Sequence, residues 1–195
     1  PFESDQTTHC SVVDQAGNMV AVTYTLNTNF GTGIVAAGTG ILLNNEMDDF
    51  SAKPGVPNAY GLVGGAANAV AAGKRPLSSM TPTLVLKDQQ PWLVTGSPGG
   101  ARIITTVLQQ IVNGIDFGMN PAEAAAAVRF HHQWMPDELR VEKGFSPDTL
   151  HLLRQKGQNV VVKPAMGRTQ TIQVQGQALW GYSDPRNPDG LTLGY

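Results

Sequence analysis

The alternation of apolar and polar positions along the chain predicts two β-hairpins. The first spans residues 11–26 and turns at 14–18, and the second spans 83–95 and turns at 88–91. In both, β-rich apolar stretches flank a short segment of turn-forming residues, which is the usual pattern of a hairpin. Three further strands are expected over 159–163, 169–174 and 178–182.

Apolar residues at helical spacing predict three helices between the hairpins and the last strands. The first is expected over 101–112, with Gly114 at its end. The second begins after Asn120, because a capping residue, a proline at the first helical position and Glu123 form a capping-box pattern. The third is expected from Ser146 to Gly157.

Residues 28–82 form a long stretch with little periodicity and many glycines. Loops of that length within one domain are usually functional. The order of strands, loop, helices and strands predicts an α+β or layered sandwich fold rather than a regular βαβ series. A chain of 195 residues is expected to form one domain.

Composition and charge exclude several classes of protein. Hydrophobic residues make up 41% of the chain, which argues against disorder. The formal net charge of -2 provides no basic surface, so nucleic acid is not an expected partner. No apolar run is long enough to span a membrane. The single Cys10 excludes an internal disulfide and is expected to be shielded from solvent, while Pro1 in place of Met indicates a fragment or a processing product.

The glycine-rich segments do not form a nucleotide site. Residues 31–38 lack the strand and helix that a dinucleotide fingerprint requires, and residues 95–100 lack the lysine of a P-loop. Gly99 and Gly100 precede a predicted helix, where free amides and the helix dipole could stabilise an oxyanion. Alternatively, the two glycines only allow the strand to pack close to the helix.

Two loops carry further candidate chemistry. Residues 44–49 gather three carboxylates and two amides, which could bind an ammonium group or a hard cation, or could form a solvated acidic turn. Residues 74–80 contain two cations and two serines, which could hold a carboxylate or form a surface turn. His131 and His132 follow the second predicted helix, where we expect a packing role, since no metal-binding pattern is present.

Five ordered segments resemble the γ-glutamyltranspeptidases, and the resemblance covers nearly the whole chain. The segments are residues 6–9, 20–27, 43–50, 75–83 and 96–100. The resemblance is to the small C-terminal catalytic subunit of bacterial members. It implies an N-terminal nucleophile hydrolase with an αββα sandwich, of which this chain forms the C-terminal half. Residues 1–6 would then be the end of the large subunit, and residues 7–195 the small subunit.

The family resemblance also implies a reaction. A precursor cleaves itself at the bond between Gln6 and Thr7, and the released α-amine of Thr7 serves as base for its own hydroxyl. Thr7 then attacks the γ-carbonyl of glutathione or another γ-glutamyl compound and holds the γ-glutamyl group as an ester. Water gives hydrolysis, and an amino-acid or peptide acceptor gives transpeptidation. The resemblance further implies a large-subunit partner that supplies an arginine, a periplasmic or secreted location, and no cofactor or metal.

Matching positions imply individual roles within that site. Thr25 supports the nucleophile, and the amides of Gly99 and Gly100 form the oxyanion hole. The remaining matches bind substrate or cover it: Asn27, Glu46 and Asp49 receive the α-amine, Ser78 and Ser79 receive the α-carboxylate, and Tyr60 belongs to a lid. Family members carry an acid or an amide at the position of Glu46.

Two alternatives stay open. The chain could be a binding fragment of the same fold that never matures, which the state of Thr7 would reveal. It could also be an acylase for the glutaryl side chain of cephalosporins, a substrate that lacks an α-amine and would not need Asn27, Glu46 and Asp49.

Overall fold

Two layers of antiparallel sheet form the centre of the molecule. A computed structural model of the chain describes residues 7–58 and 60–194. In the first layer, β1 (Thr8–Val13) and β2 (Met19–Tyr24) form the first predicted hairpin. The second layer has the strand order β3-β4-β8-β9 and consists of β3 (Thr83–Lys87), β4 (Gln90–Gly96), β8 (Gln170–Gln175) and β9 (Ala178–Ser183). The β1–β2 hairpin packs against β4 and β8.

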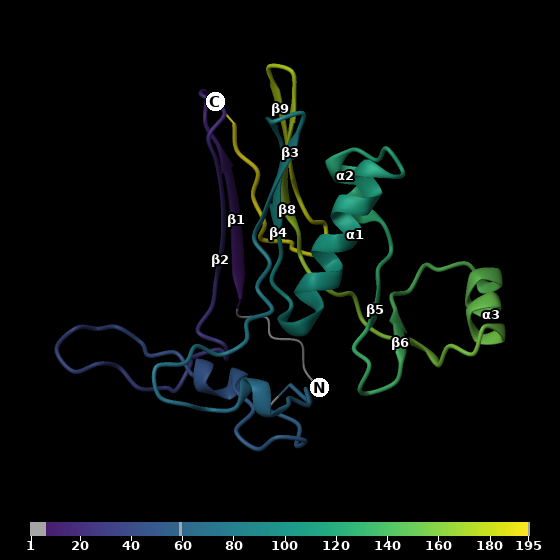
Figure 1. The fold of residues 1–195 in the computed structure, drawn as a ribbon. Coiled ribbons are helices and arrows are strands. Elements are labelled where there is room, and N and C mark those ends of the chain that lie inside the picture. Colours follow the sequence, from purple (N-terminus) through teal and green to yellow (C-terminus); the bar gives the residue numbers. More distant parts are fainter. Residues whose placement is uncertain (1–6, 59, 195) are drawn as a thin grey trace.

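Helices cover the opposite face of the four-stranded sheet. α1 (Ile103–Ile115) contacts β4, and α2 (Pro121–Ala126) contacts β8 and β9. Figure 1 shows this order of layers, from the hairpin through the larger sheet to the two helices. The arrangement confirms the predicted α+β class and provides three of the four layers of an αββα sandwich. The predicted capping box of α2 is present, with Asn120 and Glu123 each accepting a backbone amide.

A smaller unit lies beside the sandwich. Its sheet has the order β5-β6-β7 and consists of β5 (Phe130–His132), β6 (Leu139–Val141) and β7 (Val160–Val162). α3 (Pro147–Gln155) contacts β7, and Figure 1 shows it at the outer end of this unit. Ser146 caps α3 as predicted, because its hydroxyl accepts the amide of Thr149.

The long aperiodic stretch gathers at one end of the sandwich. Its described residues contain two short 3-10 turns, η1 (Glu46–Asp49) and η2 (Ala66–Asn68), together with isolated bridges. Figure 1 shows these loops in blue at the end where β2 finishes and α1 begins. The long stretch, the end of β2 and the start of α1 are far apart in the sequence but lie together at this end of the molecule.

The predicted turn of the second hairpin is wrong. The sequence predicts a turn over residues 88–91, but the structure turns on Asp88 and Gln89 alone, with positive φ at both. Gln90 and Pro91 belong to β4, and its pairing with β3 shifts register between Val85 and Leu86 of β3. Proline is tolerated there because a bulge removes one ladder hydrogen bond.

The predicted end of the first helix is also wrong. Gly114 lies inside α1, where a β-carbon would stand 3.5 Å from the side chain of Trp92. The left-handed residue that follows the helix is Gly118, and the amide of Met119 donates to the carbonyl of Asn113. The glycine that ends the helix is therefore the next one along the chain.

The two adjacent histidines lie in β5 rather than on a helix. Consecutive side chains of a strand point to opposite faces, so His131 is buried and His132 is exposed. His131 has the packing environment that we expect, with its ring nitrogens 2.7 Å from Thr105 Oγ1 and 3.0 Å from Gln133 Oε1. Cys10, expected to be shielded, is exposed on β1.

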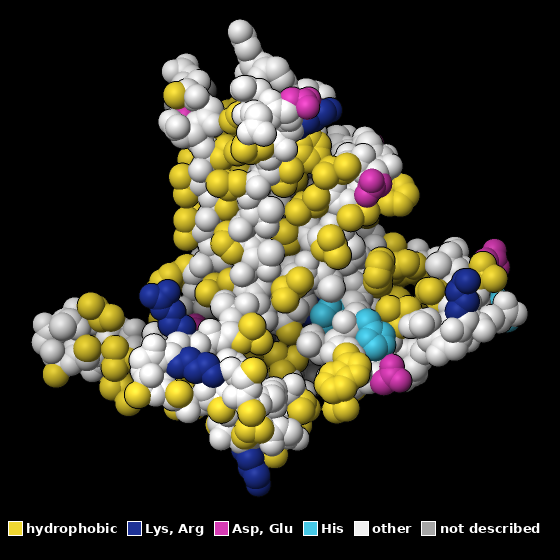
Figure 2. Space-filling view, viewed as in Figure 1, with side chains coloured by type: hydrophobic (Ala, Val, Ile, Leu, Met, Phe, Trp, Pro, Cys, Tyr) yellow, Lys and Arg dark blue, Asp and Glu magenta, His cyan; other side chains and the backbone are white. Residues whose placement is uncertain are grey.

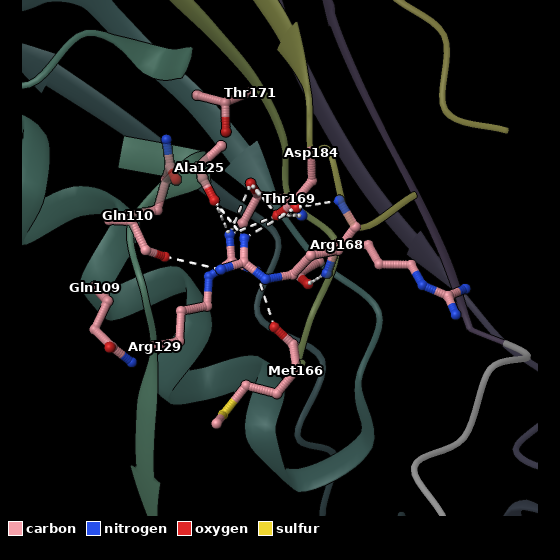
Figure 3. A network of polar contacts seen from close by, with 12 residues as sticks. Gln109, Gln110, Ala125, Arg129, Met166, Arg168, Thr169, Thr171 and Asp184 are labelled. Carbon is pink, nitrogen blue, oxygen red and sulfur yellow. Dashed lines mark hydrogen bonds and ion pairs between the residues drawn. The ribbon is translucent and has the colours of Figure 1, made fainter. Parts of the chain in front are cut away.

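A buried ion cluster joins α2, β6 and the end of β9. Arg129 donates to Asp184 and to the carbonyls of Ala125 and Met166, as Figure 3 shows. Arg186 pairs with Asp184 and with Glu142. Each of the two carboxylates is nearly inaccessible to solvent and has a cationic partner, which is the condition for keeping charges in a protein interior.

Candidate active site

Nine of the ten predicted site residues line one cavity of about 40 Å³ at the loop end of the sandwich. They are Thr7, Thr25, Asn27, Glu46, Asp49, Tyr60, Ser78, Ser79 and Gly100. The tenth, Gly99, directly precedes Gly100 in the chain. The structure therefore brings together residues that lie up to 93 positions apart in the sequence.

The hairpin register places Thr7 beside Thr25. Thr8 pairs with Tyr24, so the residues one step further out face each other at the open end of the hairpin. Thr7 is 8% exposed, and its hydroxyl donates to Thr25 Oγ1 at 3.1 Å. Thr25 Oγ1 also accepts the amide of Asn27 at 2.9 Å. The hydrogen bond to Thr25 therefore fixes the direction of the Thr7 hydroxyl within the lining of the cavity.

Asn27 lines the cavity and bonds to two loop residues, Asn45 and Tyr60. Its φ of 72° is left-handed, and its side chain donates to the carbonyl of Asn45 at 3.2 Å. The Tyr60 hydroxyl lies 2.7 Å from the carbonyl oxygen of Asn27 and 2.8 Å from its Oδ1. Tyr60 therefore lines the cavity while its hydroxyl is bonded to Asn27.

The turn η1 carries two carboxyl groups, Glu46 and Asp49, whose pKa values are both raised. Burial, the hydrogen bond that the protonated Glu46 donates to Asp49, and the negative charge of Asp49 raise the pKa of Glu46 to about 7. Burial also raises the pKa of Asp49, and the charge of Asp48 adds to that effect. Two negatively charged carboxylates repel each other at this separation, so one of them tends to keep its proton. A bound cation would stabilise both charges and displace the proton from Glu46.

Ser78 and Ser79 approach the cavity from the segment that leads into β3. The amide of Met80 donates to Ser78 Oγ, and Thr81 Oγ1 donates to the carbonyl of Ser79. The cations that precede these serines in the sequence do not line the cavity. The ammonium group of Lys74 instead donates to the carbonyls of Ala67 and Ala69.

Gly99 and Gly100 connect β4 to η3 (Gly100–Arg102), which leads directly into α1. Both have positive φ, 138° and 56°, which favours glycine for backbone reasons. A β-carbon at Gly100 would meet nothing within 4 Å, so close packing does not explain that glycine. Within the described residues, neither amide donates to a backbone carbonyl.

Apolar side chains complete the cavity, and the sequence analysis missed them. They are Leu62, Met80, Ala101 and Ile103. A motif search gives no signal for such residues, because any aliphatic side chain could fill these places. A neighbouring cleft of about 560 Å³ shares Asp49, Leu62, Ser79 and Ala101 with the cavity.

Two kinds of feature are absent from the part of the chain that the structure describes. It contains no group of three or more His, Cys, Asp or Glu side chains that could hold a metal ion. None of its helices has the length and hydrophobicity needed to cross a bilayer.

Comparison with known proteins agrees with the geometry. Residues 1–193 match the family described as Gamma-glutamyltranspeptidase. The chain belongs to this family. It is 72% identical to the glutathione hydrolase proenzyme of Escherichia coli, over all of this chain and 34% of that relative. A proenzyme from Pseudomonas sp. is 49% identical over all of this chain and 36% of its own length. The γ-glutamyltranspeptidase chain thus spans about a third of these relatives.

Solved structures give the same result. A chain of Helicobacter pylori γ-glutamyltranspeptidase superposes with a TM-score of 0.89 at 57% identity, covering 92% of this chain and 100% of the other. The cephalosporin acylase of Bacillus halodurans reaches a TM-score of 0.77 at 30% identity, covering 91% of this chain and 32% of the acylase. Both comparisons support the sandwich fold, and the identities favour the transpeptidases over the acylase.

Proposed function

We propose that this chain carries the catalytic nucleophile of an enzyme that hydrolyses and transfers γ-glutamyl groups. The observation that carries the proposal is one cavity whose lining includes both a hydroxyl nucleophile, Thr7, and a pair of carboxyl groups, Glu46 and Asp49. A γ-glutamyl compound has a reactive carbonyl at one end and an α-ammonium group at the other. The lining of the cavity therefore offers a partner for each end of the substrate.

The chemistry proceeds through an ester on Thr7. The α-amine of Thr7, free after cleavage of the bond to Gln6, accepts the hydroxyl proton while Oγ1 attacks the γ-carbonyl. The amides of Gly99 and Gly100 stabilise the oxyanion of the tetrahedral intermediate. Its collapse breaks the amide bond, and the proton held by the Thr7 amine passes to the leaving amine. Water or an acceptor amine then attacks the ester and regenerates the hydroxyl.

Substrate recognition divides between two loops. The Glu46–Asp49 pair takes the α-ammonium group, with Asn27 beside it, while the Ser78 and Ser79 segment takes the α-carboxylate. Tyr60 holds the covering loop through Asn27. This division requires substrates that carry both charges, such as glutathione, and disfavours a glutaryl side chain.

A large subunit is the partner that we propose, with the subunit boundary between Gln6 and Thr7. The curated relatives are proenzymes about three times as long as this chain. The outer face of the β1–β2 hairpin exposes Val12, Val20, Val22 and Tyr24, and Figure 2 shows hydrophobic side chains over this side of the molecule. An apolar sheet face of this kind needs a covering layer. A periplasmic or secreted location is proposed on the family resemblance alone.

The proposal is tested by substituting Thr7 in the full-length precursor. We expect Thr7→Ala to abolish both the cleavage and the turnover of a γ-glutamyl amide, because only a hydroxyl can accept the acyl group. Thr7→Ser should keep part of both activities. N-terminal sequencing of the small subunit and steady-state rates measure the two effects. Cleavage in the Thr7→Ala precursor would refute the assignment, and a wild-type precursor that never cleaves would identify a non-maturing fragment.

A further inference from the structure

The nucleophile and the glycine loop belong to different sheets. Thr7 directly precedes β1 in the hairpin layer, whereas Gly99 and Gly100 follow β4 in the four-stranded layer. An oxyanion hole works only if its amides stand at a fixed distance from the attacked carbonyl. Some contact between the two layers must therefore set this distance.

His9 lies between the layers, on the same face of β1 as Thr7. His9 is only 6% exposed to solvent. Nδ1 lies 2.8 Å from Thr23 Oγ1, and Nε2 lies 3.1 Å from Ser11 Oγ. The Ser11 hydroxyl donates to the carbonyl of Gln170 in β8 at 2.9 Å, so Nε2 must carry the proton that joins it to Ser11. His9 is thus linked to both strands of its own hairpin and, through Ser11, to the other sheet.

The ring of His9 rests on Gly96, the last residue of β4. A β-carbon on Gly96 would stand 2.1 Å from Cε1 of the ring, 2.4 Å from Nδ1 and 2.6 Å from Nε2. These separations are far shorter than any van der Waals contact, so no side chain fits between the ring and this backbone. Gly96 is extended rather than left-handed, so its backbone alone does not require glycine. The ring explains why glycine stands here.

We propose that His9 is a positioning residue whose ring, braced on Gly96, sets the distance between the Thr7 hydroxyl and the amides of Gly99 and Gly100. This inference rests on the proposed function. His9 follows Thr7 by two residues, and Gly96 precedes Gly99 by three. The contact between His9 and Gly96 therefore lies within three residues of each half of the site. Burial lowers the pKa of His9 to about 4, which keeps the ring neutral and its hydrogen bonds fixed near neutral pH.

A double-mutant cycle on the full-length precursor tests the brace. The variants are Gly96→Ala, His9→Ala and the pair combined. Gly181→Ala is the matched control, since it adds a methyl group to β9 of the same sheet, 2.6 Å from the Thr192 side chain and away from the site. His151→Ala, on the exposed side of α3, controls for loss of an imidazole. Cleavage, kcat, KM and melting temperature are measured for each protein.

The brace predicts a specific pattern. Gly96→Ala should lower kcat about 10–100-fold with KM changed less than about twofold, because a displacement near 1 Å costs on that order. His9→Ala should have a similar effect, and adding Gly96→Ala to it should cost nothing further, because the methyl group then meets no ring. His9→Gln, which keeps a donor and an acceptor, should recover part of kcat. Both control variants should keep the wild-type kcat.

Other results would overturn the brace. These are a wild-type kcat in Gly96→Ala, or losses in the double variant that multiply as for independent sites. If the wild-type protein has no turnover, the proposed function fails. The melting temperatures then decide the brace: coupling between positions 9 and 96 supports the contact, and additive shifts refute it. Should His9→Ala fail to fold, His9→Gln takes its place in the cycle.

Discussion

Glu46 and Asp49 stand at the two ends of η1, and the raised pKa values of both carboxyl groups make substrate binding depend on charge. At the scale of single residues, this pair is the feature that distinguishes a γ-glutamyl site from a general acyl-transfer site. Two predictions follow from its electrostatics, one for each carboxyl group.

Asp49→Asn should weaken the binding of donors that carry an α-amine. A hydrogen bond to a charged group contributes about 1.5–3 kcal/mol, so KM should rise on the order of 10–150-fold. Analogues that lack the α-amine should change much less, and they serve as the control in the same steady-state assay. Equal losses on both substrates would show that Asp49 has a structural role instead.

Glu46 should give KM a pH dependence near neutrality. Its pKa of about 7 means that the free enzyme gains a proton on Glu46 as the pH falls below that value. The ammonium group must then compete with this proton, so KM should rise up to about tenfold between pH 8 and pH 6. Glu46→Gln should flatten this dependence. The Thr7 amine titrates in both proteins, so a dependence that is unchanged in the variant would contradict the assignment.

Sequence patterns could predict the polar residues of the site but not its apolar ones. Thr7, Asn27 and Asp49 stand in motifs with chemical meaning, and the structure brings them to one cavity. Leu62 and Ile103 line that cavity only because distant segments fold onto it. The sequence gives no signal for the position of His9, because its contact with Gly96 joins two sheets.

At the scale of elements, the long hairpins, the capped helices and β7 were predictable, and β5 and β6 were not. The first hairpin has six residues in each strand, and Ser146 and Asn120 cap their helices as their side-chain chemistry requires. β5 and β6 have three residues each, too few to display an alternating pattern. Moreover, β6 pairs with β7 in parallel across a helix, which a local pattern cannot reveal.

The tight turn of the second hairpin provides a prediction at this scale. Gln89 has a φ of 63°, and a left-handed conformation costs an ordinary residue about 1–2 kcal/mol. Gln89→Gly should therefore stabilise the protein by roughly 0.5–1 kcal/mol, after the entropy of glycine in the unfolded chain is subtracted. Chemical denaturation measures the change. Gln90→Gly, one residue further and inside β4, is the matched control and should destabilise.

At the scale of the whole molecule, the sheets and helices of the sandwich pack against one another, whereas the outer face of the hairpin is exposed and apolar. The four-stranded sheet packs helices on one face and the hairpin on the other, and the Arg129 cluster ties the end of β9 to α2. The hairpin, in contrast, has no layer over its outer apolar face within the described chain. Catalysis is therefore expected of the assembly with the large subunit rather than of this chain alone.

The central claim is that Thr7 becomes an N-terminal residue and carries the γ-glutamyl group during turnover. The most direct test is mass spectrometry of the assembled enzyme, quenched in acid during turnover of a γ-glutamyl amide and digested. We predict that the N-terminal peptide of the small subunit begins at Thr7 and that a fraction of it is heavier by one γ-glutamyl group attached to Thr7. A peptide that begins elsewhere, or an unmodified Thr7 with the γ-glutamyl group on another residue, would contradict the account.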